Sequence, residues 1–528
     1  MSFLKRFKYE LLIALFFLAS RLPTLGHDTF NTDVWKWKVR SYDFSSGIFG
    51  LDFAQTLQKY HPGVTLMWIG TVGIKISNVY TEAANFSELQ KLFILHSIQK
   101  FLVVLVLAIS ISFIFYVLKT LFGNRYAVLA SGLLILEPFY IAITREFHLE
   151  GLLSTFMLAS TIWLYYFLQD KTQSKRLYVS AVFAGLSILT KTSSVYLVLF
   201  AGLMMLVQMF KSKSLKSDFL WFTKWFSLTL LTCFILWPAL WVIPGRVAQD
   251  LLRGIFDVGV DTDHIQFYFG KLVGDPGPFF YLVVYAFRSS IYLVLGLVMA
   301  LFTFKKLDAR QKDFGIYLFV YTIFYTLQLS IPSKKLDRYI LPGIASLSLL
   351  TSLSWSYILE KVKLNTTFKY SVFFLLGFVT IIYLHPDYLS YYNPLFGGLR
   401  TGLFVIEPKW MIGQQEVITY FKNLEKAKSF EPSGQTDSFE KVITTGRSSK
   451  VLSVAFPEKY YTQIWPFFRE INAWAVIQNI SPFAVKTRYF VYPVWDDGSS
   501  QEKRFTLKYI DTINVRGVPV YRVYERII

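Results

Sequence analysis

Long apolar runs separated by short polar segments dominate the first three quarters of the chain. A run of about 20 mostly apolar residues is long enough to cross a bilayer as a helix. Such runs predict eleven membrane-spanning helices, at 9–25, 94–118, 125–144, 150–169, 177–191, 193–210, 219–243, 280–304, 313–332, 338–359 and 367–385. The first run is followed by polar residues and a proline rather than by a small-residue cleavage site, so we interpret it as a retained anchor.

The hydrophobic pattern changes after residue 385. The tail lacks a 20-residue apolar run, and its alternating segments 451–456, 489–494 and 518–524 predict strands, whereas 414–428 has helical spacing. We therefore predict a polytopic α-helical membrane module over 1–385 and a small α+β domain over 386–528. Within the module, the first loop, 27–93, contains an amphipathic stretch from Tyr60 onward that we expect to lie along the membrane surface.

Composition and charge exclude an ordinary soluble enzyme and a disordered chain. The sequence is 54% hydrophobic and only 17% charged, yet its net charge is +19. Most of the excess lies in short connecting segments that share one side of the membrane if all eleven spans cross. These carry Lys119, Arg125, Lys171, Lys175, Arg176, Lys211, Lys213, Lys216, Lys305, Lys306, Arg310, Lys312, Lys361 and Lys363. The positive-inside rule makes that side cytoplasmic, so we expect a cell-membrane protein with a cytoplasmic N-terminus, an outer C-terminal domain and no nucleic-acid partner.

A smaller set of cations lies on the opposite, outer connecting segments. It consists of Arg145, Lys191, Lys334, Lys335 and Arg338. These residues oppose the orientation signal, and Lys and Arg at the level of the headgroups bind phosphate well. We expect them to contact an anionic ligand, although snorkelling toward lipid headgroups remains the alternative for an isolated lysine.

Carboxylates of the first loop lie within reach of these cations. Asp28 and Asp33 follow the first span closely, and either carboxylate has the chemistry to accept a proton from an attacking hydroxyl while cations stabilise a departing phosphate. The alternative is that each residue caps a local helix or turn, which the spacing favours more for Asp28 than for Asp33.

No cofactor or metal site is predicted. The sequence lacks a phosphate-binding GxxxxGK[ST] loop, an HExxH motif and a glycine-rich dinucleotide fingerprint. Its six histidines are scattered, and its single cysteine, Cys233, lies inside an apolar span.

Several short motifs occur in an order and a topological placement typical of one family. They are Asp33-Val34-Trp35, His61-Pro62-Gly63, the segment from Arg145 to Glu150, the segment from Gly185 to Lys191, and the segment from Lys335 to Pro342. Together with the start of the tail, they resemble the GT-C membrane glycosyltransferases related to protein O-mannosyltransferases and to the aminoarabinose transferase that acts on lipid A.

The resemblance implies an inverting transfer of a sugar from a polyprenyl-phosphate donor to a hydroxyl outside the cytoplasm. Asp33 would be the catalytic base. Glu150 would be a supporting acid, and it stands at a position where relatives usually have Asp. The donor phosphate would meet Arg145, Lys191, Lys335 and Arg338, with Lys334 beside them. Asp28, His61 and His148 would shape the substrate site. Val34 replaces a second acid and Gly63 a second proline of the mannosyltransferase-type motifs, which leaves a lipid, a glycan or a protein as the acceptor.

Two other functions compete with this interpretation. A transporter or flippase of a lipid-linked glycan places ionisable residues at mid-membrane depth, whereas the centres of these spans carry almost none. Glu137 is the exception, and with Pro138 we expect it near the outer end of its span. A non-catalytic assembly factor is the third possibility, and it leaves Asp33, Glu150 and the outer cations without a role.

Overall fold

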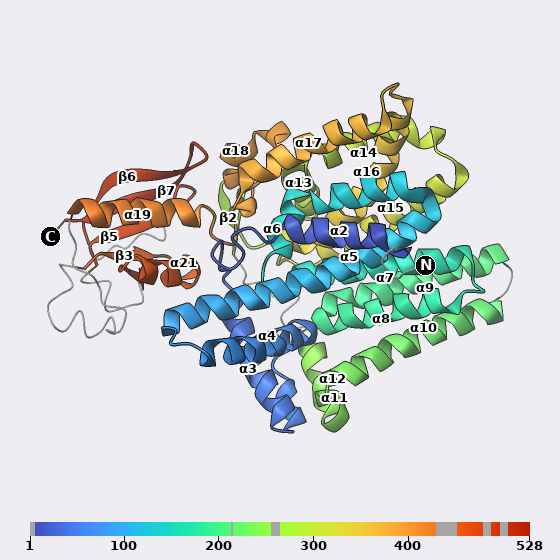
Figure 1. Cartoon of the computed structure of the whole chain (residues 1–528), viewed down its shortest axis with the longest axis horizontal. Coiled ribbons are helices and arrows are strands. Elements are labelled where there is room, and N and C mark those ends of the chain that lie inside the picture. Colours follow the sequence, from blue (N-terminus) through green and yellow to red (C-terminus); the bar gives the residue numbers. More distant parts are fainter. Residues whose placement is uncertain are drawn as a thin grey trace.

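A helical bundle and a small sheet domain make up the computed structural model (Figure 1). The structure describes residues 6–212, 215–254, 265–428, 451–478, 487–496 and 505–527. Lys213 and most of the predicted turn at 496–498 lie outside these ranges. The sheet lies at one end of the bundle (Figure 1).

Helices occupy all eleven ranges in which the sequence predicted spans. They are α2 (Lys8–Ala19), α5 (Glu88–Ile135) with α6 (Pro138–Thr144), α7 (Leu149–Gln169), α8 (Ser174–Thr190), α9 (Tyr196–Ser212), α10 (Leu215–Leu236) with α11 (Ala239–Val242), α13 (Phe280–Arg288) with α14 (Ile291–Thr303), α15 (Ala309–Ser330), α16 (Leu341–Lys361) and α17 (Thr366–Leu384). Five described helices are long and apolar enough to cross a membrane, or six if α13 and α14, bent by 114°, form one span. The fold class is confirmed, and the count of eleven stays a prediction.

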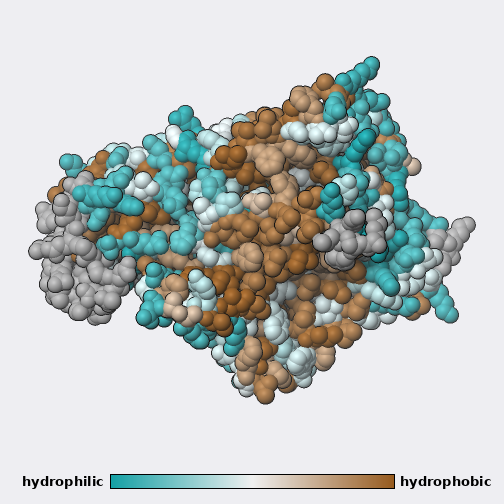
Figure 2. Space-filling model, in the orientation of Figure 1, coloured by the Kyte–Doolittle hydropathy of each residue, from teal (hydrophilic) through white to brown (hydrophobic). Residues whose placement is uncertain are grey.

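Burial separates the centre of the bundle from its periphery. The apolar window of α7 is 94% buried, whereas those of α10 and α17 are 22% buried. The outer helices expose many apolar side chains, Phe219 and Ile382 among them. Figure 2 shows an apolar band between two hydrophilic ends. A band of this kind is what a multi-pass protein presents to lipid.

The second predicted span and the first part of the third lie in one helix, α5. This helix begins at a capping box, in which the Ser87 hydroxyl accepts from the Gln90 N–H and the Gln90 side chain accepts from the Ser87 N–H. Gly123 interrupts it with φ +83° and ψ 169°, a conformation open to glycine alone. In place of the predicted loop at 119–124, the helix continues and is interrupted only at Gly123.

The first loop forms two further helices beside the bundle. α3 spans Val34–Phe49 and α4 spans Val64–Glu82, and α4 packs against both α3 and α5. A short helix, η1 (Phe53–Thr56), connects them, and α12 (Pro244–Arg253) follows α11 nearby. The predicted amphipathic stretch from Tyr60 thus contains α4.

The tail forms a five-stranded mixed sheet in the order β4-β3-β5-β7-β6. β3 (Ser453–Phe456) pairs in parallel with β4 (Trp474–Ile477) and β5 (Tyr489–Pro493), and β7 (Val518–Arg526) pairs antiparallel with β5 and β6 (Leu507–Val515). Helix α19 (Gln414–Lys428) coincides with the predicted helix, and α21 (Glu458–Glu470) connects β3 to β4. The predicted strands are β3, β5 and β7.

The core is continuous between the bundle and the tail. One cluster of buried apolar side chains includes Phe30 and Phe93 of the membrane module and Phe467 of α21. Phe467 meets the rings of both, at centroid distances of 5.6 Å and 5.5 Å. The indole N–H of Trp35 also donates to the Thr462 carbonyl at 2.5 Å, so the first loop and the tail are packed as one unit.

Candidate active site

A cavity of about 800 Å³ lies between the outer segments of the bundle and the tail. Its walls come from the start of α3, the segment before α4, the start of α7, the residue after α8, the 334–339 segment and the tail. Seven of the ten predicted site residues line it: Asp33, His61, His148, Glu150, Lys191, Lys334 and Arg338. Segments distant in sequence are thereby brought to one place.

His148 connects the two carboxylates of the cavity. Its Nε2 lies 3.3 Å from Oδ2 of Asp33, and its Nδ1 forms an ion pair with Oε2 of Glu150. Burial lowers the pKa of His148, but the charges of Glu150 and Asp33 outweigh it and raise the pKa above its ordinary value. The ring therefore places one nitrogen against each of the two carboxylates.

Two cations of the cavity contact the same carboxylates. Lys191 Nζ lies 3.0 Å from Oε1 of Glu150, and Arg338 lies 3.4 Å from Oδ2 of Asp33 and 3.7 Å from Oε1 of Glu150. Arg338 Nε has no hydrogen-bond partner among the described residues. Lys334, which is partly buried, forms no ion pair in that part of the chain either. The site therefore retains donors that an anionic ligand can use.

Asp33 is held as an anion. Its backbone N–H donates to the Asn31 side chain at 3.0 Å, and Lys36 Nζ lies 3.4 Å from its Oδ1. Burial raises the pKa of Asp33, but the hydrogen bond from His148 and the charge of Arg338 outweigh this effect and hold the pKa well below its ordinary value. These contacts therefore stabilise the charged form of the carboxylate.

The His61-Pro62-Gly63 motif attaches the first loop to the end of α8. Gly63 has φ +58°, and its N–H donates to the carbonyl of Thr190 at 3.2 Å, next to Lys191. The hydroxyls of Thr65 and Thr190 lie 2.7 Å apart. His61 faces the cavity, where burial lowers its pKa to about 3 and keeps the ring neutral.

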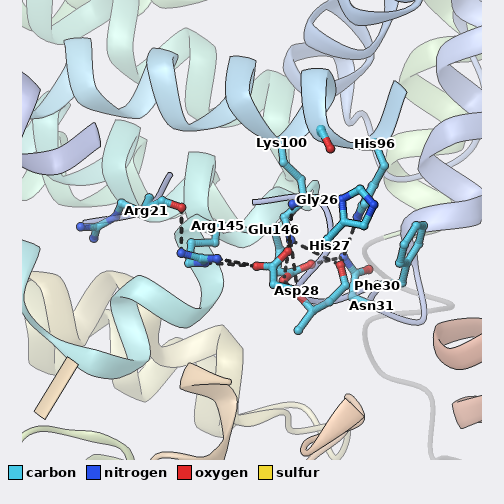
Figure 3. A network of polar contacts seen from close by, with 12 residues as sticks. Arg21, Gly26, His27, Asp28, Phe30, Asn31, His96, Lys100, Arg145 and Glu146 are labelled. Carbon is cyan, nitrogen blue, oxygen red and sulfur yellow. Dashed lines mark hydrogen bonds and ion pairs between the residues drawn. The ribbon is translucent and has the colours of Figure 1, made fainter. Parts of the chain in front are cut away.

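Asp28 and Arg145 do not reach the cavity. Asp28 is paired with Lys100 at 2.7 Å through Oδ1 and with Arg145 at 2.7 Å through Oδ2, and all three side chains are at most 2% exposed (Figure 3). Arg145 also donates to the carbonyl of Arg21 at 2.7 Å. Because this buried pairing occupies them, their predicted parts in phosphate binding and in shaping the substrate site have no geometric support.

Lys335 is also directed away from the cavity. Its side chain is 1% exposed, and its Nζ lies 2.7 Å from Asp275 and 2.6 Å from the carbonyl of Pro332. Its backbone N–H donates to the Gln266 side chain, at the start of the hairpin β1 (Gln266–Tyr268) and β2 (Lys271–Val273). Its placement fits an anchor for the 334–339 segment rather than a phosphate contact.

Several residues that sequence reasoning missed support the site. Glu146 accepts from Asn31 at 3.0 Å and from Thr29, which ties the segment before Asp33 to the buried pairs (Figure 3). Arg288 lies 2.7 Å from Asp337, the neighbour of Arg338. Lys36 and Arg40 also line the cavity, and their spacing of three and seven residues from Asp33 on one helical face was a signal in the sequence.

The tail contributes its own charged residues to the cavity. They are Glu407, Lys409, Glu458, Lys459 and Asp496, with Trp495 beside them. No local pattern marks them, because they meet the membrane module only through the folded chain. Among the described residues no group of three or more His, Cys, Asp or Glu side chains is arranged to hold a metal ion.

The chain was compared with curated proteins and with solved structures. No curated protein matches the chain. Among solved structures, ArnT from Cupriavidus metallidurans bound to undecaprenyl phosphate is similar at 13% identity, covering 99% of this chain and 98% of that one, with a TM-score of 0.48. AglB from Archaeoglobus fulgidus, an archaeal oligosaccharyltransferase in complex with an inhibitory peptide and a dolichol-phosphate, is similar at 11% identity, covering 93% and 70%, with a TM-score of 0.45.

A family model matches part of the membrane module. Residues 96–237 match the model of the dolichyl-phosphate-mannose-protein mannosyltransferases. This range includes the segment from Arg145 to Glu150 and Lys191, two of the motifs on which the sequence resemblance rests. The match confirms the predicted resemblance of this multi-pass membrane protein to the GT-C membrane glycosyltransferases.

Proposed function

We propose that the protein transfers a sugar, with inversion, from a polyprenyl-phosphate-linked donor to an acceptor hydroxyl on the outer side of the cytoplasmic membrane. The observation that carries the proposal is the cavity in which Asp33 and Glu150 share His148 and lie beside Lys191, Lys334 and Arg338. The family match over 96–237 supports the same class of reaction.

The orientation is part of the proposal. The basic segments that include Lys361 and Lys363 would face the cytoplasm, and the tail would face outward. The cavity would then open where helices leave the hydrocarbon, at the level of lipid phosphates. A lipid-linked donor also removes the need for a nucleotide-binding fold outside the cytoplasm.

Asp33 acts as the base in the proposed reaction. The acceptor oxygen attacks the anomeric carbon as the bond from that carbon to the phosphate oxygen breaks, and the acceptor proton passes to Asp33. The lipid phosphate leaves as an anion and needs no acid, so Lys191, Lys334 and Arg338 suffice to stabilise it. Glu150 holds Lys191 and His148 in place.

Donor binding adjusts the basicity of Asp33. Arg338 and His148 keep the pKa of Asp33 low. A bound phosphate competes with Asp33 for Arg338, which weakens the attraction that holds the carboxylate ionised and raises its pKa. The carboxylate would therefore become a better base when the donor is present.

The proposal is tested with Asp33→Asn in the purified full chain, supplied with a polyprenyl-phosphate sugar donor and an acceptor extract. We expect transfer to fall by about 10²–10⁴-fold, which is the contribution that base catalysis typically makes. Normal turnover in a folded, membrane-inserted variant would contradict the assignment of the base. Arg338→Ala should weaken donor binding strongly, whereas Arg310→Ala, on the expected cytoplasmic side, should not.

The competing transport function makes a different prediction. The residues that line the cavity come from the ends of helices, from connecting segments and from the tail, rather than from the middle of membrane-spanning helices. That distribution favours catalysis at the interface over conduction through the bundle. Movement of a lipid-linked glycan between leaflets, without any new glycosidic bond, would favour a flippase instead.

A further inference from the structure

The tail-side wall of the cavity has a charge pattern different from that of the membrane side. On the membrane side five cations, Lys36, Arg40, Lys191, Lys334 and Arg338, face only two carboxylates. On the tail side three carboxylates, Glu407, Glu458 and Asp496, accompany two lysines. An anionic group is therefore attracted to the membrane side, and the tail side offers it no net attraction.

Glu407 is the centre of the tail-side wall. Lys409 Nζ lies 2.5 Å from its Oε1, and Lys459 Nζ lies 3.1 Å from its Oε2, which also accepts from the indole N–H of Trp495 at 3.3 Å. The Glu407 side chain is 10% exposed, whereas the side chains of Lys409 and Lys459 are 22% and 38% exposed. The carboxylate is buried behind two ammonium groups that still reach the cavity.

This arrangement suits neutral hydroxyl groups. Each ammonium carries three N–H donors, and the contacts to Glu407 use only one of them. A sugar hydroxyl both donates and accepts, so it pairs with a charged donor and a charged acceptor held side by side. The indole of Trp495 is fixed by its bond to Glu407, and Trp37 lies on the membrane-side wall, so rings are present on both sides of the space.

The space is sufficient for more than a donor sugar. Cavities of about 300–1,000 Å³ enclose drug-sized ligands, and this one measures about 800 Å³. Inversion requires the acceptor oxygen to approach the anomeric carbon from the side opposite the phosphate. With the phosphate on the membrane-side cations, the acceptor occupies the tail side.

We propose that the tail-side wall formed by Glu407, Lys409, Lys459 and Trp495 is an acceptor subsite that recognises a neutral carbohydrate, so that the acceptor hydroxyl belongs to a glycan. This inference rests on the proposed transfer reaction for its assignment to the acceptor, and its binding chemistry is independent of that reaction. Glu407 is a positioning residue, because it acts by holding the two lysines and the indole.

The subsite is tested by binding. The full chain in lipid nanodiscs is applied to immobilised neutral oligosaccharides, acidic oligosaccharides and a library of Ser- and Thr-containing peptides. We expect retention on one or more neutral oligosaccharides. Lys459→Met and Glu407→Gln should each lower that retention at least tenfold, whereas Lys508→Met, an exposed lysine of the same domain outside the cavity, should leave it unchanged.

Each variant is also tested for polyprenyl phosphate binding, which shows whether the membrane side is intact. If Lys459→Met and Glu407→Gln lose glycan binding but still bind polyprenyl phosphate, the result supports the subsite. Retention on peptides alone, a preference for acidic glycans, no glycan retention, or equal loss in Lys508→Met would overturn it. A variant that loses both ligands is replaced by Trp495→Phe, which keeps an aromatic ring in place of the indole and removes the N–H to Glu407. Unchanged glycan retention in Trp495→Phe would count against the subsite.

Kinetics separate this inference from the proposed function. In a transfer assay with the retained oligosaccharide, Lys459→Met should raise the acceptor KM at least tenfold and leave the donor KM unchanged, and Lys191→Met should do the reverse. If the glycan binds but no sugar is transferred, the proposed function fails and the carbohydrate site remains. If transfer occurs and the tail-side variants change neither KM nor glycan retention, the subsite fails and the function remains.

Discussion

Neighbouring residues of the 334–339 segment have opposite surroundings. Lys334 faces the cavity, and Lys335 is buried against Asp275 and a backbone carbonyl. Consecutive side chains of an extended segment point to opposite sides, so one lysine is available to a ligand and the other stabilises the segment.

Substituting the two lysines in turn should therefore give different results. Lys334→Met should weaken binding of polyprenyl phosphate about tenfold, which is about 1.4 kcal/mol. This loss is near the lower end of the about 1.5–3 kcal/mol that a hydrogen bond to a charged group contributes. Lys335→Met should leave phosphate affinity unchanged and lower the melting temperature. Titration of both variants in nanodiscs, with thermal unfolding in parallel, measures the two effects, and equal loss of affinity would show that Lys335 contacts the ligand.

The buried pairs around Asp28 are structural at the residue scale. Asp28→Asn leaves Lys100 and Arg145 without their shared anion and should lower the free energy of unfolding by about 3–5 kcal/mol. Glu88→Gln, which breaks the exposed pair with Lys91, should change it by less than about 1 kcal/mol. Thermal unfolding of the two variants in one detergent makes the comparison.

The same carboxylate gives a pH dependence. Burial raises the pKa of Asp28, but the charges of Lys100 and Arg145 outweigh it and hold the pKa below the ordinary value of 3.8. Its stabilising contribution is therefore complete above pH 3.8 and is lost as the pH falls toward the lowered pKa. Asp28→Asn should lack that acid-dependent loss.

Sequence reasoning identified seven of the residues that line the cavity, six because they belong to short motifs near outer helix ends and Lys334 because it is a cation on an outer connecting segment. It did not predict that Lys334 faces the cavity while Lys335 is buried, or that Arg145 is buried against Asp28. Charge and spacing in the sequence do not reveal which side chains form a pair. Asp28 and Arg145 lie 117 positions apart, and only the folded chain shows that they pair.

At the scale of elements, Gly63 sets how α4 begins. It caps the helix in the left-handed region, and a Cβ built there would lie 2.2 Å from the ring of Trp37. Trp37 and His61 both line the cavity, so the backbone at Gly63 controls the shape of one wall.

Gly63→Ala should therefore destabilise the protein more than Gly517→Ala. Both glycines have positive φ, which costs an alanine about 1–2 kcal/mol, but a Cβ at Gly517 meets no atom within 4 Å. Only Gly63→Ala adds a steric clash, and it should lower transfer activity as well as the melting temperature. Equal losses of stability in the two variants would show that Trp37 moves aside freely.

Prediction of elements succeeded where periodicity was strong. The apolar runs located the helices of the bundle, and 414–428 coincides with α19. In the tail, α18 (Gly398–Val405), α21, β4 and β6 were missed. Helix α21 contains Pro466, and β6 is an edge strand with several exposed positions, so neither has the regular pattern of a core element.

At the scale of the whole molecule, the proposed orientation is open to a labelling experiment. Cys233, the only cysteine, is buried, and Cys233→Ala provides a background without thiols. In intact cells a membrane-impermeant maleimide should label a Lys508→Cys variant and should label Lys363→Cys only after permeabilisation. Both positions are exposed, so the reverse pattern would mean that the chain is inverted.

The length of α5 has a consequence for the whole molecule. Its part before the break at Gly123 is about 50 Å long at 1.5 Å per residue, about 20 Å more than the hydrocarbon thickness. In the proposed orientation the excess stands above the lipid, where Lys100 and His96 of α5 bind the first loop ahead of Asp33. A rigid helix thus fixes the height of the proposed base, Asp33, and in the proposed reaction the thickness of the surrounding bilayer would decide how far a lipid phosphate must rise to meet Arg338.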